Sequence, residues 1–155
     1  MRIEKGNVWD YHSKGYWVVI PTNLGWKANG EAVMGAGLAK QAAKRFPNLA
    51  KEYGSVLQDA AKFEEEVIYE DHKTKLILFP TIPLNKEFPY LSWKSDASLE
   101  LIERKLEQMS SYDSFEWRKI AFPWLGAGLG NLSRDDVRKV MEKYLDSKNH
   151  VVVEL

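Results

Sequence analysis

The stretch Val33-Met34-Gly35-Ala36-Gly37-Leu38-Ala39-Lys40 is the one around which we expect this chain to be organised. It is a loop of small residues that runs directly into a helical pattern over residues 38–46. Glycine allows positive φ and lets a ligand approach the backbone. The first turn of a helix offers unpaired amides and the positive end of the helix dipole. The stretch therefore predicts an anion site at a helix N-terminus.

A second glycine-dense run, Leu125-Gly126-Ala127-Gly128-Leu129-Gly130, has the same design and also precedes a predicted helix. We predict that the two loops face each other and hold one diphosphate. Four charge-assisted amide bonds of roughly 1.5 kcal/mol each would give about 6 kcal/mol. Micromolar binding needs about 8 kcal/mol, so a base or sugar must be buried as well. The alternative is that these glycines only allow tight packing of a helix on a strand.

Short apolar segments alternate with amphipathic ones along the chain. We predict strands at 2–5, 16–20, 66–69, 75–79, 119–122 and 149–155, and helices at 38–46, 48–63, 95–109 and 133–147. The strand at 16–20 should stop at Pro21, residues 8–14 should be a polar connection, and residues 22–31 and 80–94 should be long loops. This order predicts one domain over residues 1–155. Its expected class is α/β, a three-layer α/β/α sandwich with a mixed, mostly parallel central sheet. Ligands bind such folds beyond the carboxyl ends of the strands.

The composition excludes some functions. Twenty-two basic residues balance twenty-two acidic ones, and there is no cysteine. Zero net charge removes the broad electrostatic case for a nucleic-acid or membrane partner, although it is compatible with a local basic patch. Without cysteine, with scattered histidines and without a carboxylate cluster, we expect neither a metal nor a cofactor. No apolar run approaches the length of a membrane span, so we expect a cytoplasmic monomer.

Neither loop matches a strong nucleotide-binding motif. The first lacks the Gly-x-x-x-x-Gly-Lys-Ser/Thr pattern and the complete Gly-x-Gly-x-x-Gly pattern, and the second shows only Gly126-x-Gly128-x-Gly130. A general Rossmann-like nucleotide-binding protein is an alternative. That class predicts an acidic ribose-binding residue after a second strand, and none stands out here.

An ordered set of short motifs runs through nearly the whole chain. The motifs are Asn7, Ile20-Pro21-Thr22-Asn23, Met34 to Ala39, Arg45-Phe46-Pro47, Phe79-Pro80-Thr81, Ser92-Trp93-Lys94 and Pro123 to Gly130. Together they resemble the macrodomains, which are ADP-ribose-binding α/β/α domains. More narrowly, they resemble the branch that contains DNA-ADP-ribosyl glycohydrolase antitoxins and terminal ADP-ribose hydrolases. The resemblance implies a single macrodomain over residues 1–155.

The resemblance also implies roles for individual residues. Asn7 stands where the family has an Asp that accepts from the adenine amino group, and an Asn oxygen can still accept that bond. Val8 would offer its amide and pack on the base. Independently of the resemblance, Trp124 falls in a loop predicted at the ligand end, where its ring could stack on the adenine or the distal group. Asn23 would bind the distal ribose and is the candidate catalytic residue. The residues that would wrap the diphosphate and the distal ribose are Met34, Gly35, Ala36, Gly37, Leu38 and Ala39, with Leu125, Gly126, Ala127, Gly128, Leu129 and Gly130. A turn residue at Asn7 and a loop cap at Asn23 are the alternatives.

This chain departs from the family's pattern at positions that the relatives use for catalysis. The relatives carry a Lys directly after the Thr of the third motif, and here Thr81 is followed by Ile82. Ile cannot attack an anomeric carbon or form a Schiff base. The terminal hydrolases also carry an Asp in the second loop, where this chain has Gly130 or Asn131. The loop residues Lys27, Lys86 and Lys94 are the candidates to replace the missing lysine.

The sequence therefore predicts an ADP-ribose site in a cleft between the two loops. It leaves open whether the chain hydrolyses ADP-ribose 1″-phosphate or an ADP-ribosyl conjugate, or is a non-catalytic binding module. The family's phosphatases rely largely on an Asn, His or Asp beside a water, and Asn23 could belong to such a site. None of His12, His72 and His150 is obviously placed to help.

Overall fold

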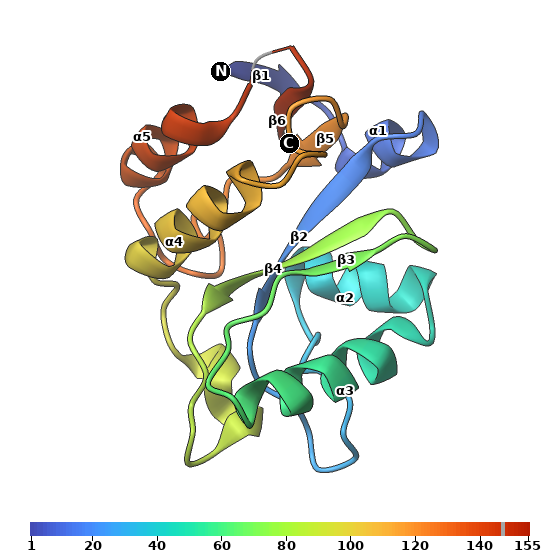
Figure 1. The fold of residues 1–155 in the computed structure, drawn as a ribbon, viewed down its shortest axis with the longest axis vertical. Coiled ribbons are helices and arrows are strands. Elements are labelled where there is room, and N and C mark those ends of the chain that lie inside the picture. Colours follow the sequence, from blue (N-terminus) through green and yellow to red (C-terminus); the bar gives the residue numbers. More distant parts are fainter. Residues whose placement is uncertain (147) are drawn as a thin grey trace.

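A six-stranded sheet forms the centre of the computed structural model, which describes residues 1–146 and 148–155 (Figure 1). The strand order is β1-β6-β5-β2-β4-β3, and only β3 runs antiparallel to its neighbour. The strands are β1 (Arg2–Lys5), β2 (Trp17–Asn23), β3 (Tyr69–Asp71), β4 (Leu76–Ile82), β5 (Ile120–Phe122) and β6 (His150–Glu154). The helices are α1 (Val8–Ser13), α2 (Gly37–Arg45), α3 (Leu49–Ala61), the 3-10 helix η1 (Pro89–Lys94), α4 (Leu99–Ser110) and α5 (Arg134–Tyr144). The predicted mixed, mostly parallel sheet is confirmed.

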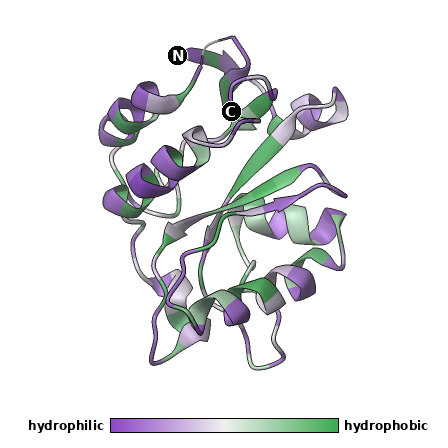
Figure 2. Cartoon of the chain, viewed as in Figure 1, coloured by the Kyte–Doolittle hydropathy of each residue, from purple (hydrophilic) through white to green (hydrophobic). Residues whose placement is uncertain are grey.

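Alternation along the strands builds two cores. Val18 and Ile20 of β2 pack with apolar side chains of α1, α2 and α3, whereas Val19 packs with those of α4 and α5. Successive strand residues point to opposite faces, so a strand that is apolar throughout is covered on both sides. Figure 2 shows these apolar strands at the centre and hydrophilic residues on the outer helix surfaces. The predicted three-layer α/β/α sandwich is confirmed.

Two strands continue through prolines, which the sequence did not predict. Pro21 lies within β2 and Pro80 lies within β4. β5 pairs with β2 only as far as Val18, and β3 pairs with β4 only as far as Leu78. Each proline therefore stands beyond the end of one neighbouring strand, where a missing N–H interrupts no ladder on that side.

Residues 8–14 are not simply a polar connection, because most of them form helix α1. Its cap is Asn7, whose side-chain Oδ1 accepts from the amide of Trp9 at 2.9 Å. Val8 and Trp9 are buried against the sheet. A six-residue helix presents too little periodicity to be recognised from sequence.

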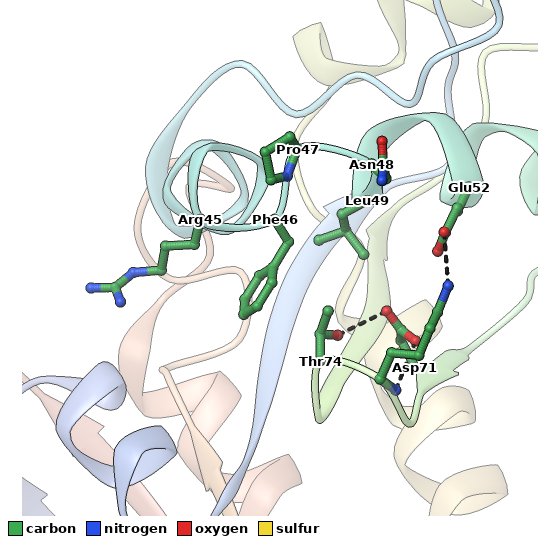
Figure 3. A pocket seen from close by; sticks show the side chains of 9 residues that line it. Arg45, Phe46, Pro47, Asn48, Leu49, Glu52, Asp71 and Thr74 are labelled. Atoms are coloured by element: carbon green, nitrogen blue, oxygen red, sulfur yellow. Dashed lines mark hydrogen bonds and ion pairs between the residues drawn. The ribbon is translucent and has the colours of Figure 1, made fainter.

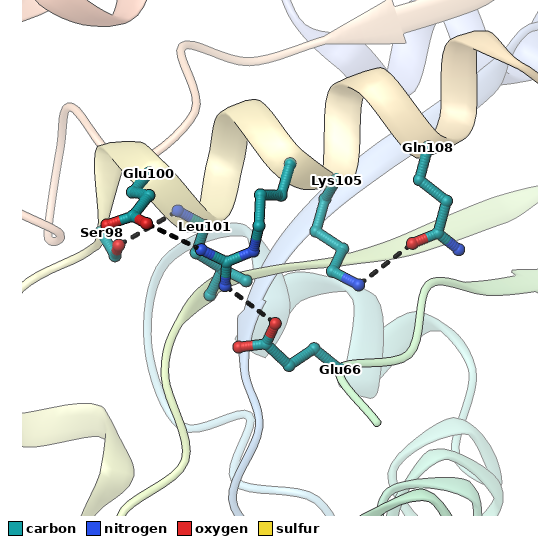
Figure 4. Close-up of polar contacts among 7 residues, drawn as sticks. Glu66, Ser98, Glu100, Leu101, Lys105 and Gln108 are labelled. Atoms are coloured by element: carbon teal, nitrogen blue, oxygen red, sulfur yellow. Dashed lines mark hydrogen bonds and ion pairs between the residues drawn. The ribbon is translucent and has the colours of Figure 1, made fainter. Parts of the chain in front are cut away.

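Helix α4 begins later than predicted, at Leu99 instead of residue 95. Ser98 provides the cap, with its hydroxyl accepting from the amide of Leu101 at 3.1 Å (Figure 4). Arg104 then binds Glu66 at 2.9 Å. Glu66 thus contacts α4 instead of beginning a strand. The strand predicted at 66–69 is instead β3, Tyr69–Asp71, which pairs with Leu76 to Leu78 of β4.

Helix α5 ends at Tyr144. The end predicted for this helix, Ser147, lies outside the described residues. Within residues 1–146 and 148–155, no helix combines the length and apolarity needed to cross a membrane.

Gly54 allows α3 to touch the loop that follows β2. A Cβ at this position would overlap the carbonyl oxygen of Gly30 and lie 2.7 Å from the amide nitrogen of Ala32. In an exposed helix, Gly→Ala normally stabilises by about 1 kcal/mol. We expect Gly54→Ala to reverse that sign and lower the free energy of unfolding by about 2 kcal/mol or more. Urea denaturation measures the effect, and an unchanged or raised free energy would contradict the close packing.

His150 is buried in a fixed protonation state. Its Nδ1 accepts from the amide of Asp146 at 2.8 Å, and its Nε2 lies 2.6 Å from the carbonyl oxygen of Phe115. An amide can only donate and a carbonyl can only accept, so the ring is neutral with its proton on Nε2. Burial lowers the pKa of His150.

This lowered pKa predicts a loss of stability in acid. The unfolded chain takes up a proton on His150 near pH 6.5, and the native state resists it. The stabilisation is complete above that pH and is lost as the pH falls toward the lower native pKa. Urea unfolding at pH 7 and pH 5 should show a smaller pH dependence for His150→Gln than for the wild type. His72→Gln, which changes an exposed ring, is the control, and equal slopes for all three proteins would refute the assignment.

Candidate functional site

The two glycine loops meet beyond the carboxyl ends of β2 and β5. A Cβ placed on Gly37 would lie 3.2 Å from Cδ1 of Leu129, so the two loops approach each other at these residues. The side chain of Leu129 is 73% exposed. Gly35 and Gly128, in contrast, have no heavy atom within 4 Å of a Cβ built on them. The two loops therefore approach each other at Gly37 and Leu129, and the backbone at Gly35 and Gly128 is open.

The first loop ends in an uncapped helix N-terminus. Ala36 is the cap residue of α2 and has no side chain that could accept from the first turn. The first amide bonded within this turn is that of Lys40, which donates to the carbonyl of Ala36 at 3.2 Å. The amides of Gly37, Leu38 and Ala39 begin the helix, so they have no acceptor within it, and the described residues provide none from outside. Gly37 is needed because its φ is +58°.

The second loop does not have the same design, so that prediction is wrong. α5 begins at Arg134, and the chain between Gly130 and the helix makes a tight turn. In this turn Asn131 donates to Gly128 at 3.2 Å, and Leu132 donates to Gly126 at 2.9 Å. The amides of residues 127–130 have no acceptor among the residues that the structure describes. The second loop thus offers open amides without placing a helix dipole behind them.

Two glycines of this loop serve packing. A Cβ on Gly126 would lie 2.9 Å from the Cβ of Ala97, and one on Gly130 would lie 2.7 Å from the same atom. Gly126 also has a φ of +72°. Close packing therefore explains why these two positions are glycine, whereas a Cβ on Gly128 would meet nothing within 4 Å.

Asn23 holds the loop that carries the first glycines. Its Nδ2 donates to the carbonyl of Val33 at 3.0 Å, and its Oδ1 accepts from the amide of Gly25 at 2.9 Å. The side chain is buried at the end of β2. The amide keeps one N–H and one lone pair for a ligand. Its loop-capping role is therefore seen directly.

Neighbouring residues fix the strand end beside Asn23. The Thr22 hydroxyl lies 2.7 Å from the hydroxyl of Tyr53, and the Thr81 hydroxyl donates to the carbonyl of Thr22 at 3.3 Å. Burial raises the pKa of Tyr53, which keeps its hydroxyl protonated. Met34 is buried in the core below the loop. These contacts fix the end of β2 and the core residues behind the first loop.

Trp124 is tied to the end of β6 by contacts that sequence reasoning missed. Its Nε1 donates to Glu154 at 3.0 Å, and Arg134 binds the same carboxylate oxygen at 3.2 Å. The guanidinium of Arg134 lies 5.4 Å from the Trp124 ring centre. Glu154 also accepts from the amide of Gly6 through its carbonyl at 2.8 Å, which places this group beside Asn7. No sequence pattern links residues this far apart.

The sequence matches the model of a known protein family. A family model described as Macro domain matches residues 27–141. The chain belongs to the Macro domain family. No curated protein matches it significantly.

Solved structures share the macrodomain fold. The macrodomain of Thermus aquaticus DarG is 22% identical, with a TM-score of 0.72, and the match covers 99% of this chain and 97% of that one. The macrodomain of Mycobacterium tuberculosis DarG is 20% identical, with a TM-score of 0.66 and coverage of 99% and 97%. Thermosipho africanus DarTG in complex with ADP-ribose is 26% identical over 89% of this chain, with a TM-score of 0.62. This macrodomain spans 38% of that longer protein.

The lysines that could replace the family's missing one all lie at the surface. Lys27 lies 3.6 Å from Glu31, and Lys86 lies 3.9 Å from Glu64. Lys94 lies 5.6 Å from the ring centre of the neighbouring Trp93. All three side chains are exposed, whereas a nucleophilic lysine is activated by desolvation or by a neighbouring cation.

The histidines lie at the opposite edge of the sheet. His12 contacts the carbonyl of Thr74 at 2.7 Å, His72 packs against Trp17, and His150 is bound at the start of β6. A cavity of about 230 Å³ also lies at that edge, between the end of α2, the start of α3 and the β3–β4 turn (Figure 3). The described residues contain no group of three or more His, Asp or Glu side chains that could hold a metal.

Proposed function

We propose that this macrodomain binds ADP-ribose, with the diphosphate between the two facing loops. Seven backbone amides, those of residues 37–39 and 127–130, have no protein acceptor in the described part of the chain. Anions are stabilised by such amides, and most strongly where a helix dipole lies behind them, as at α2. The similar Thermosipho africanus DarTG structure contains ADP-ribose, which supports the proposal.

Leu129 must move to admit the diphosphate, because its side chain lies against Gly37. At 73% exposure it buries little apolar surface, so moving it costs little free energy. After a ligand enters, the same side chain can lie across it. Leu129 would then exclude water from the amide–phosphate bonds.

The two ends of the ligand would reach different elements. By the resemblance to macrodomains, the adenine lies near Asn7, Val8 and Trp124, and the distal ribose lies near Asn23. Asn7 already accepts from Trp9. Its oxygen can accept a second hydrogen bond, since a carbonyl has two lone pairs. The contact between Trp124 and Glu154 would hold the indole ring at the adenine end.

We further propose that the chain acts as a binding module. Ile82 provides no nucleophile where related hydrolases have lysine, and Lys27, Lys86 and Lys94 lie in surface contacts. Asn23 is occupied by two hydrogen bonds that hold its own loop. It has no ionisable proton with which to activate a water. These contacts favour binding over hydrolysis.

A charge placed in the second loop tests the binding site. Gly128 is open, and we expect Gly128→Glu to fold normally but to weaken ADP-ribose binding at least about tenfold through repulsion of the diphosphate. Gly128→Gln has the same length without the charge and should bind within about threefold of the wild type. Isothermal calorimetry with ADP-ribose, AMP and NAD measures both effects. Wild-type binding of ADP-ribose no tighter than AMP would refute the diphosphate site.

Hydrolysis is tested with two substrates. We expect the wild type to release neither phosphate from ADP-ribose 1″-phosphate nor ADP-ribose from ADP-ribosylated DNA, because Ile82 provides no nucleophile and Lys27, Lys86 and Lys94 lie in surface contacts. Chromatography of the products over several hours measures release. Turnover that disappears in Asn23→Ala, while ADP-ribose binding persists, would show that the chain is an enzyme.

A further inference from the structure

Aromatic and cationic side chains gather at the amino ends of the parallel strands, on the edge opposite the two glycine loops. We call this group the aromatic–cation strip. Its members are Tyr11, Tyr16, Trp17, His72 and Trp117 with Arg2, Lys14, Lys75, Arg118 and Lys119. They come from β1, α1, β2 and the segments that lead into β4 and β5.

Trp17 lies at the centre of the strip. Its amide donates to the carbonyl of Lys119 at 2.9 Å, and the next amide, of Val18, donates to Lys75 at 3.1 Å. Sheet pairing therefore fixes one lysine on each side of Trp17. The guanidinium of Arg118 lies 4.1 Å from the Trp17 ring centre, and the His72 ring lies 5.0 Å from it.

Tyrosines extend the strip toward α1. The amine of Lys119 lies 5.7 Å from the Tyr16 ring centre, and the rings of Tyr16 and Tyr11 are 5.3 Å apart. Lys14 lies 6.0 Å from the Tyr11 ring, and Arg2 donates to the Tyr16 hydroxyl at 3.3 Å. Tyr11 and Tyr16 pack on the side of the sheet that α1, α2 and α3 cover, and Trp17 packs on the side of α4 and α5, so the strip crosses the amino ends of the strands from one face to the other.

The strip is positive in a chain whose net charge is zero. Two of its five cations form ion pairs with carboxylates. Arg2 pairs with Glu4 and Arg118 pairs with Glu70. Across residues 1–146 and 148–155, Lys14, Lys75 and Lys119 have no ion pair. Three lysines are therefore available to anions.

Trp117 is the exposed indole of the strip. Its side chain is 68% exposed, and Arg118 lies 5.8 Å from its ring centre. An exposed indole beside a guanidinium provides a flat surface on which a planar ring can stack. Aromatic stacking combined with backbone-directed cations is the way proteins hold unpaired nucleic-acid strands.

We propose that the aromatic–cation strip binds single-stranded nucleic acid. Such a strand carries both chemistries that the strip can recognise: phosphates for the three unpaired lysines, and bases for Trp117 and the neighbouring rings. An acidic peptide or an anionic membrane offers the charges without a stack of planar rings. The strip lies across the sheet from the glycine loops, so its function is independent of the proposed ADP-ribose site.

Fluorescence anisotropy with labelled ten-nucleotide oligothymidylate and oligouridylate tests the strip. Trp117→Ala should weaken binding at least about fivefold through loss of stacking. The triple variant Lys14→Gln, Lys75→Gln, Lys119→Gln should reduce the slope of log affinity against log salt by about 2, the value for three phosphate contacts on a single strand. Saturating ADP-ribose should displace neither oligonucleotide. The four substituted side chains are exposed, and circular dichroism checks that each variant is folded.

The matched control is Trp93→Ala, which removes another exposed indole, at the end of η1. It should leave oligonucleotide affinity unchanged. The proposal is overturned if neither oligonucleotide binds, if Trp93→Ala weakens binding while Trp117→Ala does not, or if ADP-ribose displaces the strand. It is also overturned if ten-residue polyglutamate or anionic phosphatidylserine vesicles bind as tightly and respond equally to Trp117→Ala.

Discussion

Parallel pairing of β2 with β5 is the constraint from which the site follows. Parallel strands end at the same edge of the sheet, and these two are neighbours. The loops that leave them must therefore begin side by side, although their glycines are about ninety residues apart in the sequence. The contact of Gly37 with Leu129 is the local result of this topology. The same pairing gathers the amino ends of the strands at the far edge, where the aromatic–cation strip lies.

Glycines divide into two groups with different physical roles. Gly25, Gly54, Gly126 and Gly130 lie where a Cβ would collide with neighbouring chain, so they allow segments to pack closely. Gly35 and Gly128 have open space where a Cβ would be. Because the first group holds the loops against η1, α3 and α4, the second group is presented on a rigid support. Such support reduces the entropy lost when a ligand orders a loop.

The sequence predicted the parts of the fold in which one face of an element is continuously apolar. The central strands, the long helices and the order of the layers belong to this part, because their periodicity is set by burial. It missed α1, whose six residues are held by Asn7 and by two buried side chains. The sequence also predicted that the second strand ends at Pro21. The strand continues because β5 pairs with β2 only as far as Val18, and the length of β5 is set by a distant part of the chain. For the site, the glycines identified the two loops. The hydrogen bonds of Asn23 and Trp124 could not be predicted, because their partners come close only in the folded chain.

The prolines in β2 and β4 have a consequence for the buried backbone groups. Both strands extend past their neighbours toward the glycine loops, which leaves short lengths of backbone on that side without a partner strand. Thr22, Asn23 and Pro80 are buried there, and a buried N–H without an acceptor destabilises a fold. Because proline has no N–H, Pro21 and Pro80 each leave one donor fewer to satisfy. The two strands can therefore continue to the loops at a smaller cost in unpaired backbone.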